Sequence, residues 1–420
     1  MREMKESGIE WIGQIPNDWN IRRGKYLFTY VQKPIRKDDE VITCFRDGEV
    51  TLRSNRREEG FTISDKEIGY QGIDKGDLIV HGMDGFAGSI GISDSRGKAS
   101  PVLNVLDTDE NKRFFMYYMR AAAWSGLFLS LATGIRVRTC DTNWGKLREV
   151  MYLVPSKDVQ NRVVSFLDKK SSEIDSLISC IQKEIETLDE YKNSLITEAV
   201  TRGLDPNVEL KDSGTKWCPY IPKNWNYTNP KALFKQRYDR AYPGDRQLTA
   251  SQEHGIVFQD EFMEMTGARV VTVIKDFSIL KHVEPGDFVI SMRSFQGGLE
   301  YSENRGCISS AYVMLIPDKK LVYPPFYRWF FKSSKYINAI QSTSNLVRDG
   351  QAMRYANFAQ VPLFIIPVAE QKKIAEYLDL RVSEINKVLK EKENQIGILQ
   401  DLKKSIIYEY VTGKKEAPAV

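Results

Sequence analysis

The residue types that most often carry out catalysis or bind metal are few in this chain and lie far apart. The three histidines, His81, His254 and His282, have no other His or Cys at metal-ligand spacing, so no histidine-based catalytic or metal centre is expected. The five cysteines form no CxxC pair, which argues against a zinc site or a disulfide framework. We therefore expect small buried residues at all five positions: Cys44, Cys140, Cys180, Cys218 and Cys307.

Motifs for nucleotide chemistry are also missing. The sequence has no GxxxxGK[ST] phosphate loop, so it is not expected to perform ATP-driven work. The glycines of DGFAGSIG lack the strand–GxGxxG–helix context of a cofactor-binding loop. Glu190-Tyr191-Lys192 has the ExK form of a nuclease motif, but it lies in a helical segment with no suitably placed upstream carboxylate. We interpret it as a structural helix segment.

Composition narrows the class of protein. The 420 residues include 60 Lys+Arg and 56 Asp+Glu, a net charge of +4, which excludes a highly cationic nucleic-acid coat but allows a local basic patch. No apolar run approaches the ~20 residues of a membrane span. The segment MREMKESGIEWIG also lacks the apolar core of a signal peptide. We expect a cytoplasmic protein with no membrane contact.

The chain contains an internal repeat. Two segments that we call the opening motifs, residues 5–28 and 211–234, share eleven of 24 positions without a gap, and they hold four of the seven tryptophans. A second match, between residues 160–201 and 371–412, has 14 identities in 42 positions. Between the matches, turn–strand segments (75–80 and 285–290) and aromatic segments (FFMYYMR and FYRWFFK, expected to be short buried helices) recur in the same order. We infer that one unit has been duplicated and that the sequences between the matched segments have diverged.

The second matched segments predict two long amphipathic helices. Apolar residues alternate at spacings of four and three, as in the seam of a coiled coil. A helix of roughly 40 residues is ~60 Å long, so its apolar stripe needs a partner helix, and the other copy is the economical one. Lys192 and Lys403 interrupt both seams at the same place, where a polar residue commonly fixes register or partner. The apolar seam residues are Leu167, Ile174, Ile178, Ile181, Ile185, Leu188 and Leu195 in the first helix, and Leu378, Ile385, Leu389, Ile396, Leu399 and Ile406 in the second.

These features predict an α+β fold in which two globular mixed α/β domains are joined by two long helices. The helices are expected to pack as an antiparallel coiled coil, which gives an internal pseudo-two-fold repeat. The expected boundaries are 1–157 for the first domain, 158–203 for the central helix, 204–368 for the second domain and 369–420 for the C-terminal helix and tail. Each helix is expected to end close to the opening motif of the other copy. The second helix ends near the C-terminus and the first opening motif lies near the N-terminus, so the chain termini are expected to lie close together.

The opening motif SGIEWIG–IP–W, the helix start P…Q…I/V…FLD…S-EID and the closing E-x-V-T run resemble the specificity subunit of type I restriction–modification systems. The resemblance covers essentially the whole chain, in order and in both copies. Two departures bear on local backbone geometry. The proline before the second helix is shifted by one position, Pro155 against Pro367, and Cys218-Pro219 stands where the first opening motif has Ile12-Gly13.

The resemblance implies a non-catalytic subunit that recognises double-stranded DNA with a bipartite target. Residues 1–157 and 204–368 would each be a target recognition domain that reads one half of the target through the major groove. The helices would set the half-site spacing and dock two methyltransferase (M) subunits, with restriction (R) subunits as further partners. No cofactor would bind this chain, because S-adenosylmethionine belongs to the methyltransferase partner, and ATP and Mg belong to the restriction partner.

A methyltransferase activity in the chain itself is not supported by its motifs. An adenine methyltransferase needs an (N/D)PP(Y/F) tetrapeptide whose polar first side chain holds the target amino group. The nearest match is Tyr323-Pro-Pro-Phe326, and a tyrosine does not supply the required amide or carboxylate acceptor. This chain is expected to recognise DNA while its partners do the chemistry.

The candidates for DNA contact lie in loop-like stretches that differ between the copies. Arginine and lysine bind phosphates, and Arg, Asn or Gln read base edges. The four tryptophans of the opening motifs occur in constant segments, so we interpret them as structural anchors rather than base-stacking platforms. The candidates are Arg53, Arg56, Arg57, Arg96, Lys98, Arg136 and Arg138 in the first domain, and Arg237, Arg240, Arg293, Ser294, Gln296, Arg305, Arg348 and Arg354 in the second.

Two other functions stay open at this point. The first is a duplicated coiled-coil scaffold that binds proteins instead of DNA. The second is the specificity subunit of a related bipartite system in which methylase and nuclease are fused in one partner chain.

Overall fold

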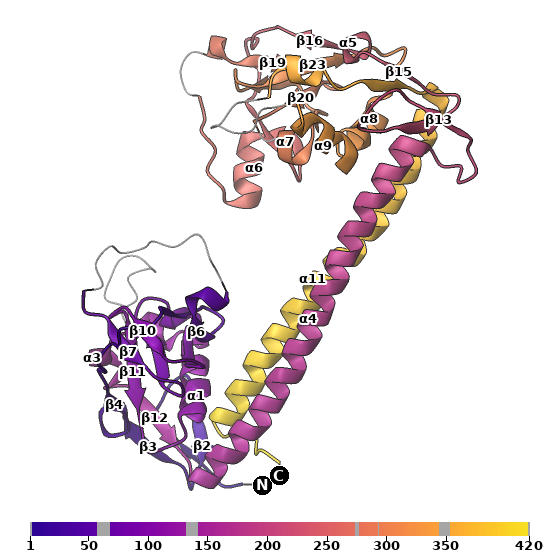
Figure 1. Ribbon diagram of the computed structural model, residues 1–420. Helices are drawn as coiled ribbons and strands as arrows, with labels where there is room; N and C mark the ends of the chain where they lie inside the picture. Colours follow the sequence, from indigo (N-terminus) through magenta and orange to yellow (C-terminus); the bar gives the residue numbers. More distant parts are fainter. Residues whose placement is uncertain are drawn as a thin grey trace. The chain divides into compact units, whose positions relative to one another are not determined.

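The computed structural model describes residues 2–56, 68–131, 142–273, 277–292, 294–343 and 353–418. The chain divides into two compact units, Met1–Ile181 with Asn394–Val420, and Gln182–Glu393. Each unit contains a small mixed domain and one part of each of two long helices (Figure 1).

The domain of the first unit is built on a four-stranded antiparallel sheet of order β4-β11-β8-β9, accompanied by the two-stranded pairs β1–β2, β3–β12, β5–β6 and β7–β10. Its strands are β1 (Met4–Glu6), β2 (Gln14–Pro16), β3 (Asn20–Arg23), β4 (Thr29–Tyr30), β5 (Ile42–Cys44), β6 (Val50–Leu52), β7 (Gln71–Ile73), β8 (Leu78–His81), β9 (Ile90–Ile92), β10 (Gly97–Ala99), β11 (Leu103–Asp107) and β12 (Met151–Val154). Its helices are η1 (Gly24–Tyr26), η2 (Arg53–Asn55), η3 (Gly85–Ala87), α1 (Lys112–Trp124), α2 (Leu127–Ser130) and α3 (Trp144–Leu147).

The domain of the second unit repeats this plan around a sheet of order β16-β23-β20-β21, with the pairs β13–β14, β15–β24, β17–β18 and β19–β22. Its strands are β13 (Leu210–Asp212), β14 (Tyr220–Pro222), β15 (Asn226–Thr228), β16 (Phe234–Arg237), β17 (Leu248–Ser251), β18 (Gly255–Phe258), β19 (Lys281–Val283), β20 (Phe288–Ile290), β21 (Glu300–Tyr301), β22 (Gly306–Ile308), β23 (Val313–Pro317) and β24 (Leu363–Ile365). Its helices are α5 (Pro230–Leu233), α6 (Gln259–Thr266), η5 (Phe277–Ile279), α7 (Ser294–Gly297), α8 (Pro324–Phe330), α9 (Ser334–Gln341) and α10 (Tyr355–Phe358).

The core of each domain forms where the sequence predicts it. The turns at Gly76 and Gly286 have φ of +89° and +99°, a backbone conformation that glycine adopts without strain. They lead into the buried strands β8 and β20. The aromatic segments form α1 and α8, confirming the expected short buried helices. Asn111 caps α1 by accepting from two backbone N–H groups, and α8 begins on two prolines.

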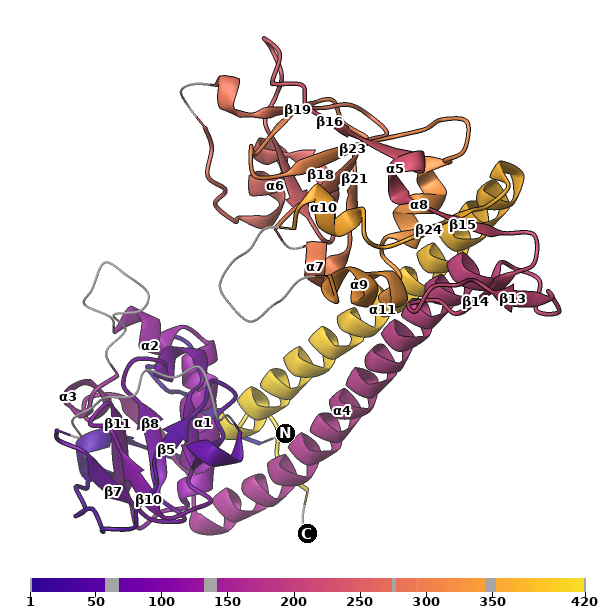
Figure 2. The ribbon, with the colours of Figure 1, turned by 45° about the horizontal axis from the view of Figure 1, so that its top comes forward.

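Two long helices, α4 (Lys157–Arg202) and α11 (Val368–Val411), complete both units (Figure 2). In the first unit the ring of Phe166 lies 4.4 Å from that of Tyr410, and Lys403 binds Asp175. In the second unit Lys392 binds Glu184, 2.6 Å apart. Because partner numbers in α11 fall as residue numbers in α4 rise, the helices are antiparallel. The expected fold class, mixed domains with two long antiparallel helices and an internal repeat, is confirmed.

The end of each long helix packs against the opening motif of the other copy. Gly203 directly follows α4 and Gly413 is the second residue after α11; their φ angles are +78° and +73°. A side chain at Gly203 would lie against the ring of Trp225, and one at Gly413 against Pro16 and Trp19. In the first unit the Lys414 ammonium donates to the Gln14 carbonyl at 2.6 Å. The chain termini are therefore close together, as expected (Figure 1).

The expected burial of the cysteines is correct for three of them. Cys44, Cys218 and Cys307 are buried, whereas Cys180 is exposed. Cys180 lies on the face of α4 opposite the seam, so the prediction for it was wrong. Cys140 lies outside the described residues. Within the described ranges, no helix is long and apolar enough to cross a membrane.

Candidate nucleic-acid interface

One aspartate on each long helix fastens the domain to the helix. Asp168 accepts hydrogen bonds from Arg113 (2.6 Å) and from the Tyr117 hydroxyl (2.8 Å). In the second unit Asp379 accepts from Arg328 and from the indole N–H of Trp329, both at 2.6 Å. These aspartates are the last residues of the repeated segments FLD and YLD. We call this contact between domain and helix the joint, and it explains why the aspartate occurs in both copies.

A buried glutamine forms the second part of this joint. The side chain of Gln160 accepts from the backbone N–H of Asn111 and donates to the Pro155 carbonyl. Gln371 accepts from the N–H of Tyr323 and donates to the Ile366 carbonyl in the same way. Both glutamines are fully buried. The joint therefore fixes the first turn of each long helix against the segment that enters α1 or α8.

The predicted seam residues lie on the inner faces of the helices. All thirteen are buried or half-buried, while most positions between them are exposed. The lysines in the seam have partners on the opposite helix: Lys403 binds Asp175 at 2.7 Å in the first unit, and Lys192 lies 3.5 Å from the Asn386 amide oxygen in the second. Asn386 occupies in the second repeat the place of Asp175 in the first, so the same polar contact occurs in both units.

An ion-pair cluster lies at the start of the central sheet in each domain. In the first domain Lys33 binds the buried Asp77 at 2.7 Å and Asp74 at 2.9 Å. In the second domain Arg237 binds the buried Asp287 at 2.7 Å and Asp239 at 2.8 Å. Arg237, a predicted DNA contact, has a side chain that is only 14% exposed and is engaged on both sides. Arg237 therefore stabilises the domain through its two carboxylate partners.

Arg96, another predicted contact, lies in the same cluster of the first domain. Its guanidinium donates to Asp39 at 2.7 and 3.0 Å, to Asp74 at 2.6 Å and to the Pro34 carbonyl at 3.0 Å. Together with Lys33 it lowers the pKa of Asp74 to about 2, and it also lowers the pKa of Asp39. The charge of Arg96 is thus neutralised by Asp39 and Asp74 within the first domain.

The Arg96 cluster is expected to make the first domain sensitive to acid. Because the folded-state pKa of Asp74 lies below its ordinary value of 3.8, its stabilising effect is complete above that value and is lost as the pH falls towards about 2. Thermal unfolding of the full chain between pH 5 and pH 2 should therefore show a loss of stability that shrinks in Arg96→Gln. An Arg96→Gln curve parallel to that of the wild type would contradict this assignment.

The second domain carries a different set of cations. Arg305 is 61% exposed, and its Nε lies 3.6 Å from Glu284 and 4.0 Å from Asp245. Arg240 and Lys281 bind the backbone carbonyls of Ile279 and Tyr312. Burial and the nearby Arg240 charge lower the pKa of Lys281. Among the described residues neither of these two cations has a carboxylate within ion-pair distance, so an anion such as a DNA phosphate would relieve their repulsion.

The first domain has exposed arginines on the turn between β5 and β6 and on the segment after β6. Arg56 binds Asp47 and Glu49, and its guanidinium lies 4.3 Å from the Phe45 ring centre. Arg53 is half-buried and donates to the Thr43 hydroxyl. Lys98 is half-buried on β10. Among the described members of the predicted set in this domain, Arg56 is the most exposed.

The remaining predicted contacts of the second domain differ in accessibility. Ser294 is fully buried and accepts a hydrogen bond from the backbone N–H of Ser291, so it is placed as a turn residue. Gln296 and Arg354 are exposed. The other predicted contacts lie outside the described residues: Arg57, Arg136, Arg138, Arg293 and Arg348.

The sequence patterns did not single out two further cations, Arg46 and Lys281. Arg46 is 65% exposed at the β5–β6 turn and binds Asp84 at 2.9 Å. The Asp47-Gly48 dipeptide beside it, with Gly48 at φ +86°, is a turn signal that marks this loop. Lys281, the second, lies at the start of a short strand, where no sequence feature distinguishes it from an ordinary surface lysine.

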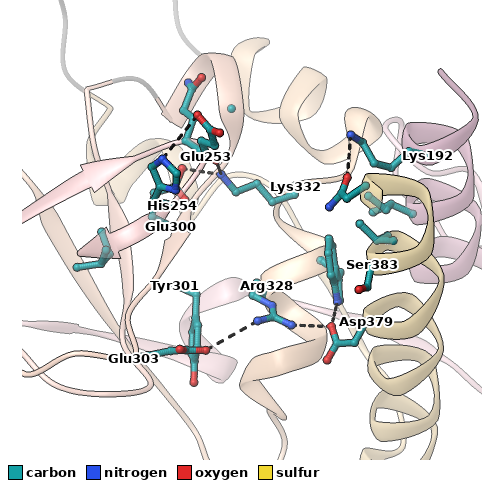
Figure 3. Close-up of a pocket in the computed structure, with 18 of the residues that line it drawn as sticks. Lys192, Glu253, His254, Glu300, Tyr301, Glu303, Arg328, Lys332, Asp379 and Ser383 are labelled. Carbon is teal, nitrogen blue, oxygen red and sulfur yellow. Dashed lines mark hydrogen bonds and ion pairs between the residues drawn. The ribbon is translucent and has the colours of Figure 1, made fainter. Parts of the chain in front are cut away.

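The second unit has a pocket of about 1030 Å³ between its domain and the helices (Figure 3). Most of its charged groups are paired, as Lys332 binds Glu300 at 2.6 Å and Arg328 binds Asp379 at 2.6 Å. Burial raises the pKa of Glu300, and Lys332 opposes this effect. The pocket also reaches Lys192, Lys387 and Lys390 on the helices. Within the described part of the chain, no group of His, Cys, Asp and Glu side chains is suited to hold a metal ion.

Comparison with known proteins places these features in context. No family model matches the sequence. A protein of Methanocaldococcus jannaschii that carries the name type I restriction enzyme MjaX specificity subunit is 23% identical over 441 aligned residues, which cover 96% of this chain and 95% of that protein.

Solved structures give the same result for the fold. A chain from a structure described as the basis of complex assembly and conformational transition of the type I R-M system matches with a TM-score of 0.68 and 12% identity, over 96% of this chain and 99% of that one. The HsdS subunit from Thermoanaerobacter tengcongensis matches with a TM-score of 0.48 and 14% identity, over 98% and 100% of the two chains. That score is too low to indicate a shared arrangement. The resemblance drawn from the opening motifs and the helix motifs is confirmed: over nearly its whole length, this chain is similar to the specificity subunits of type I restriction–modification systems.

Proposed function

We propose that this chain is the non-catalytic DNA-recognition subunit of a type I restriction–modification complex in the cytoplasm. Each domain reads one half of a bipartite target through the major groove. The paired helices set the distance between the half-sites and dock two methyltransferase subunits, and restriction subunits join the same complex. S-adenosylmethionine is then bound by the methyltransferase partner, and ATP and Mg by the restriction partner.

One observation supports this proposal most strongly. The same sheet order, the same helix joint and the same seam contact occur twice, whereas the cations around the small strands differ between the copies. Arg240 and Lys281 of the second domain stand where the first domain has Pro34 and the buried Gln71. A constant frame with variable recognition residues is the arrangement expected of two readers with different specificities.

The proposal is tested with the full chain, alone and in complex with a type I methyltransferase subunit that co-purifies with it. We expect the chain alone to transfer no methyl group from S-adenosylmethionine to DNA. The complex is expected to protect two separated segments of the target duplex in a footprinting assay. Methyl transfer by the chain alone, or a complex without any protected site, would refute the proposal. The second of these outcomes would favour a scaffold that binds proteins.

A further inference from the structure

Arg96 and Arg305 occupy the same position in the two domains. In the first domain Gly97, directly after Arg96, pairs with Ile73 between strands β10 and β7. In the second domain Gly306, directly after Arg305, pairs with Val283 between strands β22 and β19. The residues one step before these partners, Gly72 and His282, are therefore also equivalent.

The two domains also share the acid pair that faces this position. Asp39 accepts a hydrogen bond from the backbone N–H of Arg36 at 2.8 Å, and Asp245 accepts one from the N–H of Tyr242 at the same distance. The other acid is Asp74 in the first domain and Glu284 in the second. The backbone N–H of Asp74 donates to Asp77, and that of Glu284 donates to Asp287.

Different side chains occupy the two acid pairs. In the first domain the guanidinium of Arg96 lies between Asp39 and Asp74, and its side chain is 23% exposed. In the second domain the ring of His282 fills this place, 2.7 Å from Asp245 and 2.8 Å from Glu284, and it is 1% exposed. Arg305 is left at the rim with a side chain that is 61% exposed.

The residue at position 72 or 282 explains the difference. A Cβ atom added to Gly72 would lie 2.6 Å from Nη2 of Arg96 and 2.5 Å from the Pro34 carbonyl oxygen. A side chain at this position would therefore require the Arg96 guanidinium and the Pro34 backbone to move. Glycine admits the arginine, whereas histidine takes over its hydrogen bonds and displaces it.

We propose that this single position decides whether the repeated arginine is a structural residue or a DNA contact. Arg96 is structural because its charge is used between Asp39 and Asp74. Arg305, which His282 keeps at the exposed rim of the acid pair, contacts a DNA phosphate beside the half-site that the second domain reads. This inference rests on the proposed function and extends it by assigning different roles to two arginines that the sequence makes alike.

Chemical modification of the free chain tests the placement without DNA. Phenylglyoxal reacts with accessible guanidinium groups, so peptide mapping should find Arg305 modified and Arg96 protected. In His282→Gly, Arg305 is expected to move between the acids and become protected. In Gly72→His, Arg96 is expected to become reactive. The wild-type measurement needs no variant, so it can refute the proposal even if both variants fail to fold. Equal reactivity of the two arginines in the wild type would overturn it.

Salt dependence of binding tests the contact itself. The probe is a synthetic duplex that carries the target mapped by methylation-sensitive sequencing, bound by the full complex. Loss of one phosphate contact reduces the slope of log K against log salt concentration by about 0.9. We expect this reduction in Arg305→Gln and in His282→Gly. Arg96→Gln is the matched control, and in it the slope should stay unchanged while the melting temperature falls.

The outcomes separate this inference from the proposed function. If the wild-type complex binds the duplex and Arg305→Gln keeps the full slope, the phosphate contact is refuted while DNA recognition stands. If His282→Gly keeps the slope and leaves Arg305 reactive, the role of position 282 is refuted. If the wild-type complex binds no duplex at all, the proposed function itself fails.

Discussion

Insertion of four residues into each long helix is expected to widen the gap between the two recognised half-sites by one to two base pairs. Four residues add about 6 Å to a helix, and one base pair adds about 3.4 Å to DNA. Four residues also turn a helix about 40° beyond one full turn, close to the roughly 35° twist of one base pair. A four-residue insertion therefore increases both the distance and the rotation between the two ends of the helix, as the addition of base pairs does between two half-sites.

The antiparallel pairing dictates how this insertion is made. Lys392 binds Glu184, so residues 184–187 and 390–393 lie opposite each other in the second unit. Both segments are duplicated, and the mapped target of the variant is compared with that of the wild type. The control variant duplicates only residues 184–187, which leaves the helices unequal and should impair assembly. An unchanged gap in an active double-insertion variant would contradict the spacing role of the helices.

Trp225→Ala is expected to lower the free energy of unfolding of the second unit by about 3–5 kcal/mol, the usual cost of removing a large buried aromatic ring. The Trp225 side chain is fully buried in the core and lies against Phe364 and Gly203, so it joins the second opening motif to the end of α4. Its indole N–H has no hydrogen-bond partner among the described residues. Trp225→Phe keeps most of the packing and loses no hydrogen bond, so its effect should be much smaller.

Urea unfolding of the full chain measures this effect, and DNA affinity gives the second readout. Because Trp225 is buried, its replacement should reduce affinity only as far as it reduces the folded fraction. A Trp225→Phe variant that is stable and yet loses DNA affinity would show that the ring stacks on a base and does not act as a structural anchor.

The constant parts of this protein could be predicted from the sequence because they depend on local pattern and on repetition. The heptad spacing indicated the seam, and the FLD, YLD and Q positions recurred in both copies without indicating which residues they bind. The turns at Gly76 and Gly286 likewise indicated the strands β8 and β20. The helix period and the turn geometry depend on neighbouring residues, whereas the partners of the joint are distant in the sequence, Asn111 being 49 residues from Gln160.

The roles of individual arginines could not be predicted in this way, because their partners are distant in the sequence. Arg96 is neutralised by Asp39, 57 residues away. Arg305 stands in the same Arg-Gly dipeptide, yet it is exposed because of His282 on a neighbouring strand. The exposure of Cys180 has a simpler cause: a helix that pairs through one narrow seam leaves most of its surface open.

The most direct test of two independent readers uses the chain's own repeat. Asn20 pairs with Val154 and Asn226 pairs with Ile365, so residues 226–365 can replace residues 20–154 at equivalent strand positions. Methylation-sensitive sequencing of a host that carries the resulting complex then reads out the target. We predict two identical half-sites in inverted orientation, each equal to the half-site of the second domain. A target that keeps the first domain's half-site, or one in which both halves change, would contradict this account.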